Sequence, residues 1–157
     1  MKLLLTLLAT CATFSAAQVV NPCPTGYEVF WMDSATPVCL NFAMYGKGTW
    51  SELRQMCQAQ GADLAKLEGN LHYQVVQYIN QHPALMDEAF WIGGTDAASE
   101  GNWVWVIDNT PMDTQSPPWY PGQPNHGTAA NCACLSTPDF MFHSCDNDRK
   151  MYAICQI

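Results

Sequence analysis

Apolar residues recur at helical spacing in two segments of the first half of the chain. The first segment opens with a capping box formed by Thr49 and Glu52, and the second stops at Pro83. The apolar faces of the two segments are, in order, Trp50, Leu53, Met56 and Cys57, and Leu71, Val75, Tyr78 and Ile79. This spacing predicts amphipathic helices over 50–60 and about 71–82.

In the second half the pattern changes to that of strands. The run Trp-Val-Trp-Val-Ile at 103–107 is rich in aromatic and β-branched residues, which favour strands. Shorter strand-like runs occur at 27–32, 89–94, 131–135, 140–143 and 151–156. One strand, two helices and then several strands predict an α+β domain.

Between Asp108 and Ala130 lie 23 residues without clear periodicity, and they hold five of the ten prolines. A loop of this length inside a compact domain is usually functional. Proline restricts the unfolded chain, so such a loop can keep a defined shape without regular hydrogen bonding. We therefore expect the loop 108–131 to present the functional surface.

The N-terminus has the pattern of a secretory signal peptide. A positive Met1-Lys2 start precedes a leucine-rich stretch, and Ser15-Ala16-Ala17 supplies small residues before a cleavage site. The apolar stretch ends near Phe14, which is too short to span a membrane. We expect residues 1–17 to be removed and 18–157 to form one secreted, extracellular domain.

Composition narrows the range of partners. The chain of 157 residues carries 14 acidic and 6 basic side chains, a net charge of −8. Removing Lys2 leaves 14 acidic and 5 basic side chains, or −9. Nucleic-acid binding needs clustered Lys and Arg, so it is not expected, and neither is membrane insertion. Seven of the eight cysteines would remain, which predicts three disulfides and one free thiol in an oxidising compartment.

Several short motifs follow one another in a fixed order. They are Cys23-Pro-Thr-Gly-Tyr27, Trp50 to Cys57, Phe90-Trp91-Ile92-Gly93-Gly94, Trp103-x-Trp105 before Asp108-Asn109-Thr110-Pro111, Trp119-x-x-Gly122-Gln123-Pro124-Asn125, Asn131-Cys132 and Tyr152-x-Ile154-Cys155. In this order they resemble a C-type lectin-like domain over about 23–157. The resemblance implies two helices packed on antiparallel sheets, a long Pro-rich loop and three disulfides.

The resemblance also implies which cysteines pair. By this likeness Cys57 pairs with Cys155, Cys23 with Cys39, and Cys132 with Cys145, which leaves Cys134 free. The third pairing has an alternative, because residues two apart in a strand point to the same side. Either Cys132 or Cys134 could therefore reach Cys145.

In the family that the chain resembles, sugars bind through a calcium ion held in the long loop. The likeness implies that Gln123 and Asn125 contact both the metal and the sugar. Trp119, Tyr120, His126 and Asn131 are further candidates for sugar contacts, as an aromatic shelf with polar neighbours.

The sequence departs from the family at other metal positions. Ala130 stands where the family has a glutamate, unless the short loop shifts Asn131 there, and Phe140-Met141-Phe142 replaces a Trp-Asn-Asp triplet. Calcium prefers six to eight oxygen ligands, several of them charged, so two neutral amides predict weak calcium binding.

We expect a non-catalytic function. A hydrolase needs a nucleophile beside a base, and Cys134 with His143 is the sole candidate pair, without a recognisable oxyanion element. The sequence favours a secreted lectin that recognises microbial or cell-surface glycans in innate immunity. The alternative is a calcium-independent module that uses the same loop to bind a protein partner.

Overall fold

The computed structural model describes residues 21–115, 118–125 and 127–157. The predicted signal peptide, 1–17, lies outside these ranges. The elements are β1 (Glu28–Trp31), β2 (Pro37–Gly48), α1 (Trp50–Ala59), β3 (Asp63–Leu64), α2 (Asn70–Gln81), β4 (Phe90–Thr95), β5 (Val104–Trp105), the 3₁₀ turn η1 (Gly127–Ala129), β6 (Cys132–Leu135), β7 (Phe142–Cys145) and β8 (Met151–Gln156). In the described ranges no helix has the length and apolar character needed to cross a bilayer.

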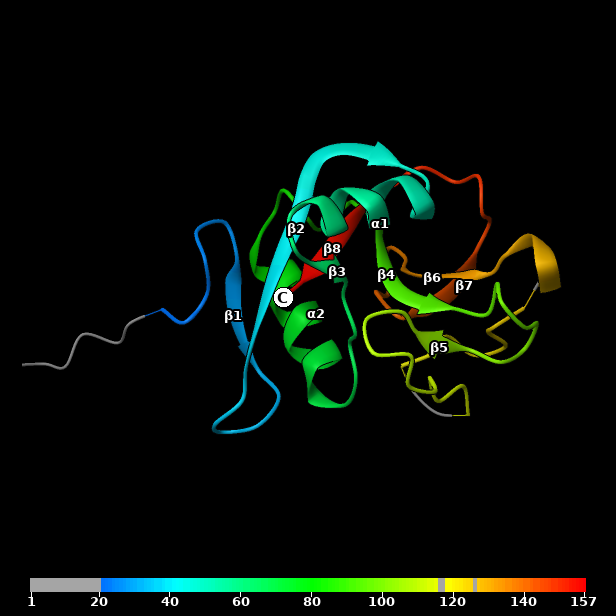
Figure 1. Ribbon diagram of the computed structural model, residues 1–157, viewed down its shortest axis with the longest axis horizontal. Coiled ribbons are helices and arrows are strands. Elements are labelled where there is room, and N and C mark those ends of the chain that lie inside the picture. The colour runs from blue at the N-terminus through cyan, green and yellow to red at the C-terminus, as the bar shows by residue number, and fades with distance from the viewer. Residues whose placement is uncertain (1–20, 116–117, 126) are drawn as a thin grey trace, which may run out of the picture.

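The strands form one sheet of eight strands in the order β1-β2-β8-β4-β6-β7, with β3 attached to β8 and β5 to β4. Strand β8 pairs antiparallel with β2 and β3 and parallel with β4. The hairpin β1–β2 and the pair β6–β7 lie at opposite ends of the molecule (Figure 1). The C-terminal strand therefore joins the two ends of the chain's sheet.

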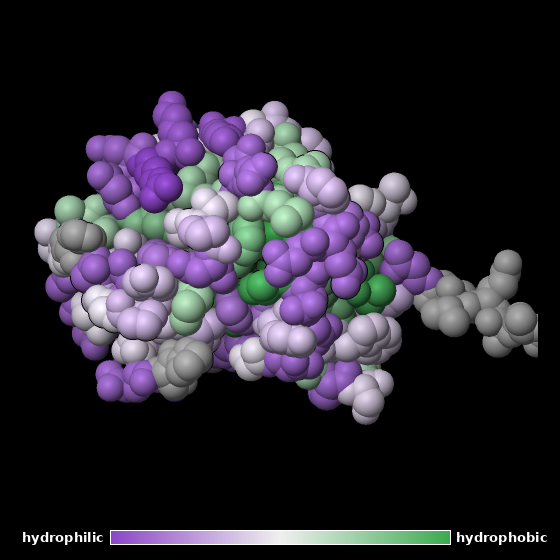
Figure 2. All heavy atoms as spheres, turned by 180° about the vertical axis from the view of Figure 1, so that it is seen from behind, coloured by the Kyte–Doolittle hydropathy of each residue, from purple (hydrophilic) through white to green (hydrophobic). Residues whose placement is uncertain are grey.

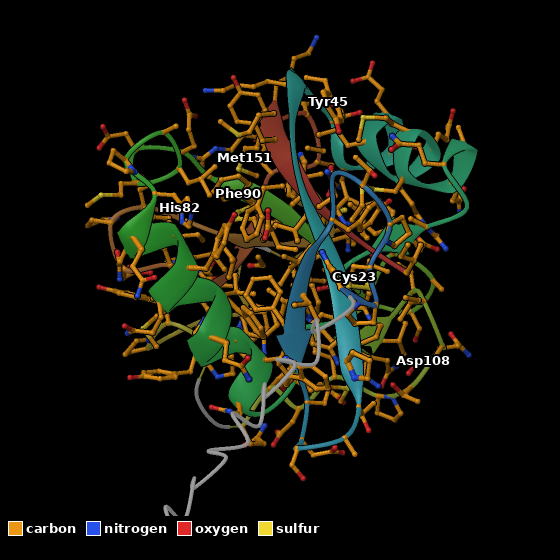
Figure 3. The ribbon with its side chains drawn as sticks, turned by 90° about the vertical axis from the view of Figure 1, so that its left-hand side faces the viewer. Cys23, Tyr45, His82, Phe90, Asp108 and Met151 are labelled. Carbon is orange, nitrogen blue, oxygen red and sulfur yellow. A yellow bond between two sulfur atoms is a disulfide. The ribbon has the colours of Figure 1, made fainter. Side chains whose placement is uncertain are left out.

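The two faces of the sheet are covered by different helices, as the view onto the β1–β2 hairpin shows (Figure 3). Helix α2 contributes Leu71, Val75 and Ile79 to one core, which also includes Ile154 of β8. Helix α1 contributes Leu53 and Cys57 to the other core, which also includes Met151, Ala153 and Cys155 of β8. Alternate residues of β8 thus face opposite cores, as the period of a strand requires.

The local signals for both helices are confirmed. Thr49 accepts the Glu52 amide proton, and the Glu52 carboxylate accepts that of Thr49, so the capping box is complete. After α1, Gly61 has φ +74°, a left-handed conformation that glycine adopts at little cost. Helix α2 ends at Gln81, as Pro83 predicted, because the residue before a proline disfavours the helical conformation.

Strand β2 was not assigned from the sequence, and β5 is shorter than the predicted 103–107. Two of the five residues in that run form the strand. Trp103 and Trp105 are buried, so the apolar run serves core packing more than sheet pairing. From behind, hydrophilic residues cover most of the visible surface, and hydrophobic residues show between them (Figure 2).

Two predicted disulfides are confirmed, Cys23–Cys39 and Cys57–Cys155. The third prediction is wrong, because Cys145 is bonded to Cys134 and the free, buried cysteine is Cys132.

The correction has a structural reason in the ladder of β6 and β7. Cys132 lies directly opposite Cys145, but it also pairs with Thr95 on β4, and its thiol is hydrogen-bonded to the Thr95 side chain. Cys134 points to the same face, and its Cα lies 6.2 Å from that of Cys145, within bonding reach. Burial raises the pKa of the Cys132 thiol to about 12, so this cysteine is a packed apolar group.

Helix α2 also holds the turn between β6 and β7. His72 Nε2 lies 2.8 Å from the carbonyl oxygen of Phe140, a residue with a positive φ of 51°. The His72 ring packs edge-on against Phe142. Desolvation lowers the pKa of His72 from 6.5 and outweighs the hydrogen bond, which raises it. A neutral ring that donates to Phe140 is consistent with both observations.

Removing the Cys57–Cys155 bond should cost more stability than removing the Cys134–Cys145 bond. The first closes a separation of 98 residues and the second a separation of 11. The chain-entropy relation gives about 4.7 and about 2.8 kcal/mol respectively. The paired alanine variants C57A/C155A and C134A/C145A would be compared by denaturant unfolding. Equal losses would contradict the prediction.

The folded protein should lose stability as the pH falls below 6.5. Below pH 6.5 His72 is protonated in the unfolded chain, whereas in the folded protein its lowered pKa keeps it neutral. The unfolding free energy therefore falls until the pH passes below the pKa of His72 in the folded protein, where it levels off. We expect H72Q to reduce this pH dependence. The measurement is the unfolding free energy of both proteins between pH 7.5 and 4.5, and parallel curves would rule out His72 as the source.

Candidate functional site

The long loop is packed on the sheet through its aromatic residues. Trp119 is 5% exposed and contacts Trp103 and Phe142 with its ring edge-on to each, at centroid distances of 5.0 and 5.8 Å. Tyr120 N donates to Phe142 O, and Phe142 N donates to Pro118 O. The middle of the loop therefore runs alongside β7 as an irregular extra strand.

A cationic residue anchors the start of the loop. Lys66 Nζ lies 2.7 Å from both Asp108 Oδ2 and Thr110 Oγ1, and 3.1 Å from Glu68 Oε2. Desolvation would raise the pKa of Asp108, but the hydrogen bonds from Lys66 and Thr110 prevail and lower it to about 2. The loop thus leaves the sheet in a fixed direction.

Ser144 of β7 holds the Gln-Pro-Asn motif, whose Gln123–Pro124 bond is cis. Gln123 Oε1 accepts from Ser144 N at 2.9 Å and lies 2.8 Å from Ser144 Oγ. Asn125 N donates to Ser144 Oγ at 2.8 Å, and that oxygen lies 2.7 Å from Asn125 O. Ser144 is 5% exposed, so this network is largely shielded from water.

These contacts do not fit a calcium site at Gln123 and Asn125. The Gln123 carbonyl oxygen, the atom that would bind a metal, already accepts from Ser144. Ala130 and Phe142, at two positions where the family has acids, are buried and offer no side-chain oxygen. No group of three or more His, Cys, Asp and Glu side chains suited to a metal occurs in 21–115, 118–125 and 127–157. A hard cation needs more and charged oxygens.

A pair of carboxylates nearby was missed in the sequence. Asp96 and Glu100 converge on Asn131, whose Nδ2 donates to Asp96 Oδ1 at 2.9 Å and lies 3.3 Å from Glu100 Oε2. The Asp96-x-x-x-Glu100 spacing after β4 is the signal that could have found it. Asn131 also accepts from Asn147 Nδ2 and is 9% exposed. One amide therefore donates hydrogen bonds to two carboxylates and joins three loops.

The accessible part of the site is an aromatic pair beside a polar cavity. Tyr120 is 44% exposed and stacks on His143, with ring centroids 4.9 Å apart, and His143 Nε2 lies 3.3 Å from Asp139 Oδ1. A cavity of about 450 Å³ adjoins this pair. Its lining is Gln123, Ala129, Ala130, Ser136, His143, Ser144, Cys145, Asp146 and Arg149. A second cavity, of about 290 Å³, lies on the Tyr120 side.

The predicted site residues divide into three groups. Trp119 and Asn131 are buried, so their predicted sugar contacts are corrected to roles in packing and in the carboxylate network. Gln123 lines both cavities, and Asn125 is exposed beside them. His126 lies outside the described residues. Tyr120, a member of the predicted aromatic shelf, is exposed, and His143 is the residue that the predicted sugar site left out.

The candidate pair for nucleophilic catalysis is also removed. Cys134 lies opposite His143 in the β6–β7 ladder, but its sulfur is bonded to Cys145. A disulfide sulfur is not a thiolate nucleophile.

Comparison with known proteins agrees with this geometry. Residues 46–157 match the family model of the Lectin C-type domain. The chain is 32% identical over 111 residues to the C-type mannose receptor 2 of Homo sapiens; the match covers 70% of this chain and 7% of the receptor. The chain thus corresponds to a small part of that relative.

Solved structures show the same fold. The mouse scavenger receptor C-type lectin carbohydrate-recognition domain is 25% identical, with a TM-score of 0.68 over 86% of this chain and 95% of that chain. A calcium-independent type II antifreeze protein is 23% identical, with a TM-score of 0.67 over 86% of this chain and 93% of that one. The second likeness concerns the fold alone.

Replacing Asn131 by alanine should destabilise the protein by about 1–3 kcal/mol, because Asp96 and Glu100 lose their shared donor. The loss should be smaller in a D96N background, where one of the two like charges is gone. Denaturant unfolding of the four proteins in this cycle measures the coupling. A loss from N131A that is unchanged by D96N would contradict the shared role.

Proposed function

Because the chain belongs to the C-type lectin domain family, we propose that it is a lectin that binds glycans at the surface formed by Tyr120, Gln123 and His143. The family is generally non-enzymatic, and the proposed activity is binding alone. One observation carries the proposal: an exposed tyrosine that lines one cavity is stacked on a histidine that lines a second, polar cavity.

The chemistry of this surface suits a sugar ring. Tyrosine presents an apolar face and a polar tip, and its stacking on His143 fixes its orientation before a ligand arrives. The cavity on the His143 side supplies hydroxyl and amide groups for the sugar hydroxyls. Binding sites commonly combine an apolar contact with a few placed polar groups in this way.

We propose that this binding does not depend on calcium at the Gln-Pro-Asn motif. Gln123 holds the loop to β7 through Ser144, so the motif shapes the surface without a metal. One such small and open site binds weakly, so useful affinity requires several sites on one surface. Repeated glycans on microbes or cells supply that arrangement, and a role in innate immunity follows as part of the proposal.

Secretion is a further part of the proposal. Three disulfides are typical of proteins that fold in an oxidising compartment. The leader-like sequence of residues 1–17 provides the route.

A second candidate function is the binding of a protein partner. Trp31 and Met32 are 42% and 46% exposed at the end of β1. The neighbouring helix α2 holds Trp31 through Gln74, whose Oε1 accepts from Trp31 N and whose Nε2 donates to Trp31 O, and it exposes Tyr73. Strand β1 lies at the opposite end of the sheet from β7 (Figure 1). Exposed aromatic residues of this kind are common at protein interfaces.

The glycan proposal predicts that binding survives chelation and depends on Tyr120. On a glycan array the wild-type protein should bind equally with calcium and with a chelator. Y120A should bind about three- to tenfold more weakly, since aromatic stacking contributes about 0.5–1.5 kcal/mol.

The matched control is Y73A, which removes an exposed tyrosine of α2 that lines neither cavity. It should bind glycans as the wild type does. Loss of all binding with the chelator would restore the metal-dependent reading. An array without any binding, together with a protein ligand lost in Y73A, would support the second candidate.

A further inference from the structure

We propose that the cavity beside His143 receives the carboxylate of an acidic sugar, with Arg149 as its cationic partner. This inference rests on the proposed function and names the ligand class for the same surface. It begins from the distribution of positive charge in a strongly acidic protein.

Most cations in the described residues are already paired. Lys47 contacts Glu88, Arg54 contacts Asp63, and Lys66 contacts Asp108 and Glu68. Arg149 and Lys150 form no ion pair within the part of the chain that the structure describes. Of these two residues, Arg149 lines the cavity and Lys150 does not.

The turn that carries Arg149 is fixed to the loop. Arg149 N donates to Asp146 O at 3.0 Å, and Asn147 N donates to Ala129 O at 3.2 Å. Asn147 Oδ1 accepts from Asn131 N at 3.0 Å. The backbone of this turn therefore has a defined position at the cavity's edge, although the Arg149 side chain is exposed.

A guanidinium group matches a carboxylate better than it matches a neutral sugar hydroxyl. Its planar donors bind both oxygens of the acid at once, and both hydrogen bonds are charge-assisted. Ser136 and His143 line the same cavity and provide further polar contacts for the rest of the ring.

The negative charges of the protein repel an acidic ligand, but this repulsion is weak at the Arg149 side of the cavity. Asp146 also lines it, and its Oδ1 accepts from Asp148 N at 3.0 Å, which occupies part of that carboxylate. More distant acids are screened beyond about 8 Å at physiological salt. The acid is therefore expected at the Arg149 edge, with weak and salt-sensitive binding.

The test compares immobilised acidic glycans with neutral counterparts that lack the carboxylate or the whole acidic residue. The pairs are a β-glucuronide with the corresponding β-glucoside, and sialyllactose with lactose. Wild-type protein should bind the acidic member about two- to fivefold more tightly, the range of a partly exposed ion pair. R149Q should lose this preference and keep its binding to the neutral glycans.

K150Q is the matched control, because it removes the same charge one residue away, outside the cavity lining. It should keep the preference, and unfolding curves of both variants should match the wild type. Equal losses in R149Q and K150Q, or none in R149Q, would overturn the inference. Equal wild-type binding to both members of each pair would overturn it and leave the proposed function standing. An array without glycan binding would overturn both.

Discussion

The fold depends on the insertion of the last strand between segments that are distant in the sequence. Strand β8 pairs with β2, β3 and β4, and its Cys155 is bonded to Cys57 of α1. These contacts are non-local, so the chain loses much loop entropy before they form. A disulfide across 98 residues reduces that cost by restricting the unfolded chain. Since β8 also separates the two cores, both helices are positioned by the same strand.

The loop has little regular secondary structure, and its contacts with the sheet and its connections hold it in place. Its beginning is held by Lys66, its middle by the packing of Trp119 on Trp103 and Phe142, and its end by Ser144. Phe142 and Ser144 belong to β7, and Lys66 and Trp103 to two connections of the sheet. Prolines lower the entropy that the loop loses on folding. Side chains on irregular backbone can therefore be held as firmly as side chains on a helix. A site with few contacts requires such fixed positions, because little binding energy is then spent on ordering the site.

Much of the fold could be predicted from residues with local signals. The capping box, Pro83 and the apolar periods located both helices, because these signals act within one or two turns. The motif order gave the family and two of the disulfides. Strand β2 was missed although Val38, Leu40 and Phe42 alternate, because Cys39 and Ala43 on its other side are buried as well. A strand buried on both faces lacks the polar alternation that marks a half-exposed one.

The site was harder to predict, because it depends on tertiary contacts. The two-residue period of a strand leaves Cys132 and Cys134 equivalent toward Cys145, and a third strand distinguishes them through Thr95. Trp119 and Tyr120 are adjacent in sequence, yet one packs against β7 and the other faces solvent. The sequence around them does not indicate which of the two aromatic residues is buried. The residues on which the site now depends, Tyr120 and His143, meet only because β7 lies beside the loop.

The loss of acidic ligands changes what can hold the loop in place. A metal organises a loop by collecting charged oxygens that would otherwise repel one another. Here Phe142 is buried against Trp119 and Trp105, and Ser144 satisfies the amide of Gln123. Apolar packing and neutral hydrogen bonds do not require an ion and do not attract one. Recognition then has to come from ring stacking and from uncompensated side-chain charge, which act directly on the ligand. Under the proposed function, such a surface would select the face and the charge of a sugar in place of the paired hydroxyls that a metal selects.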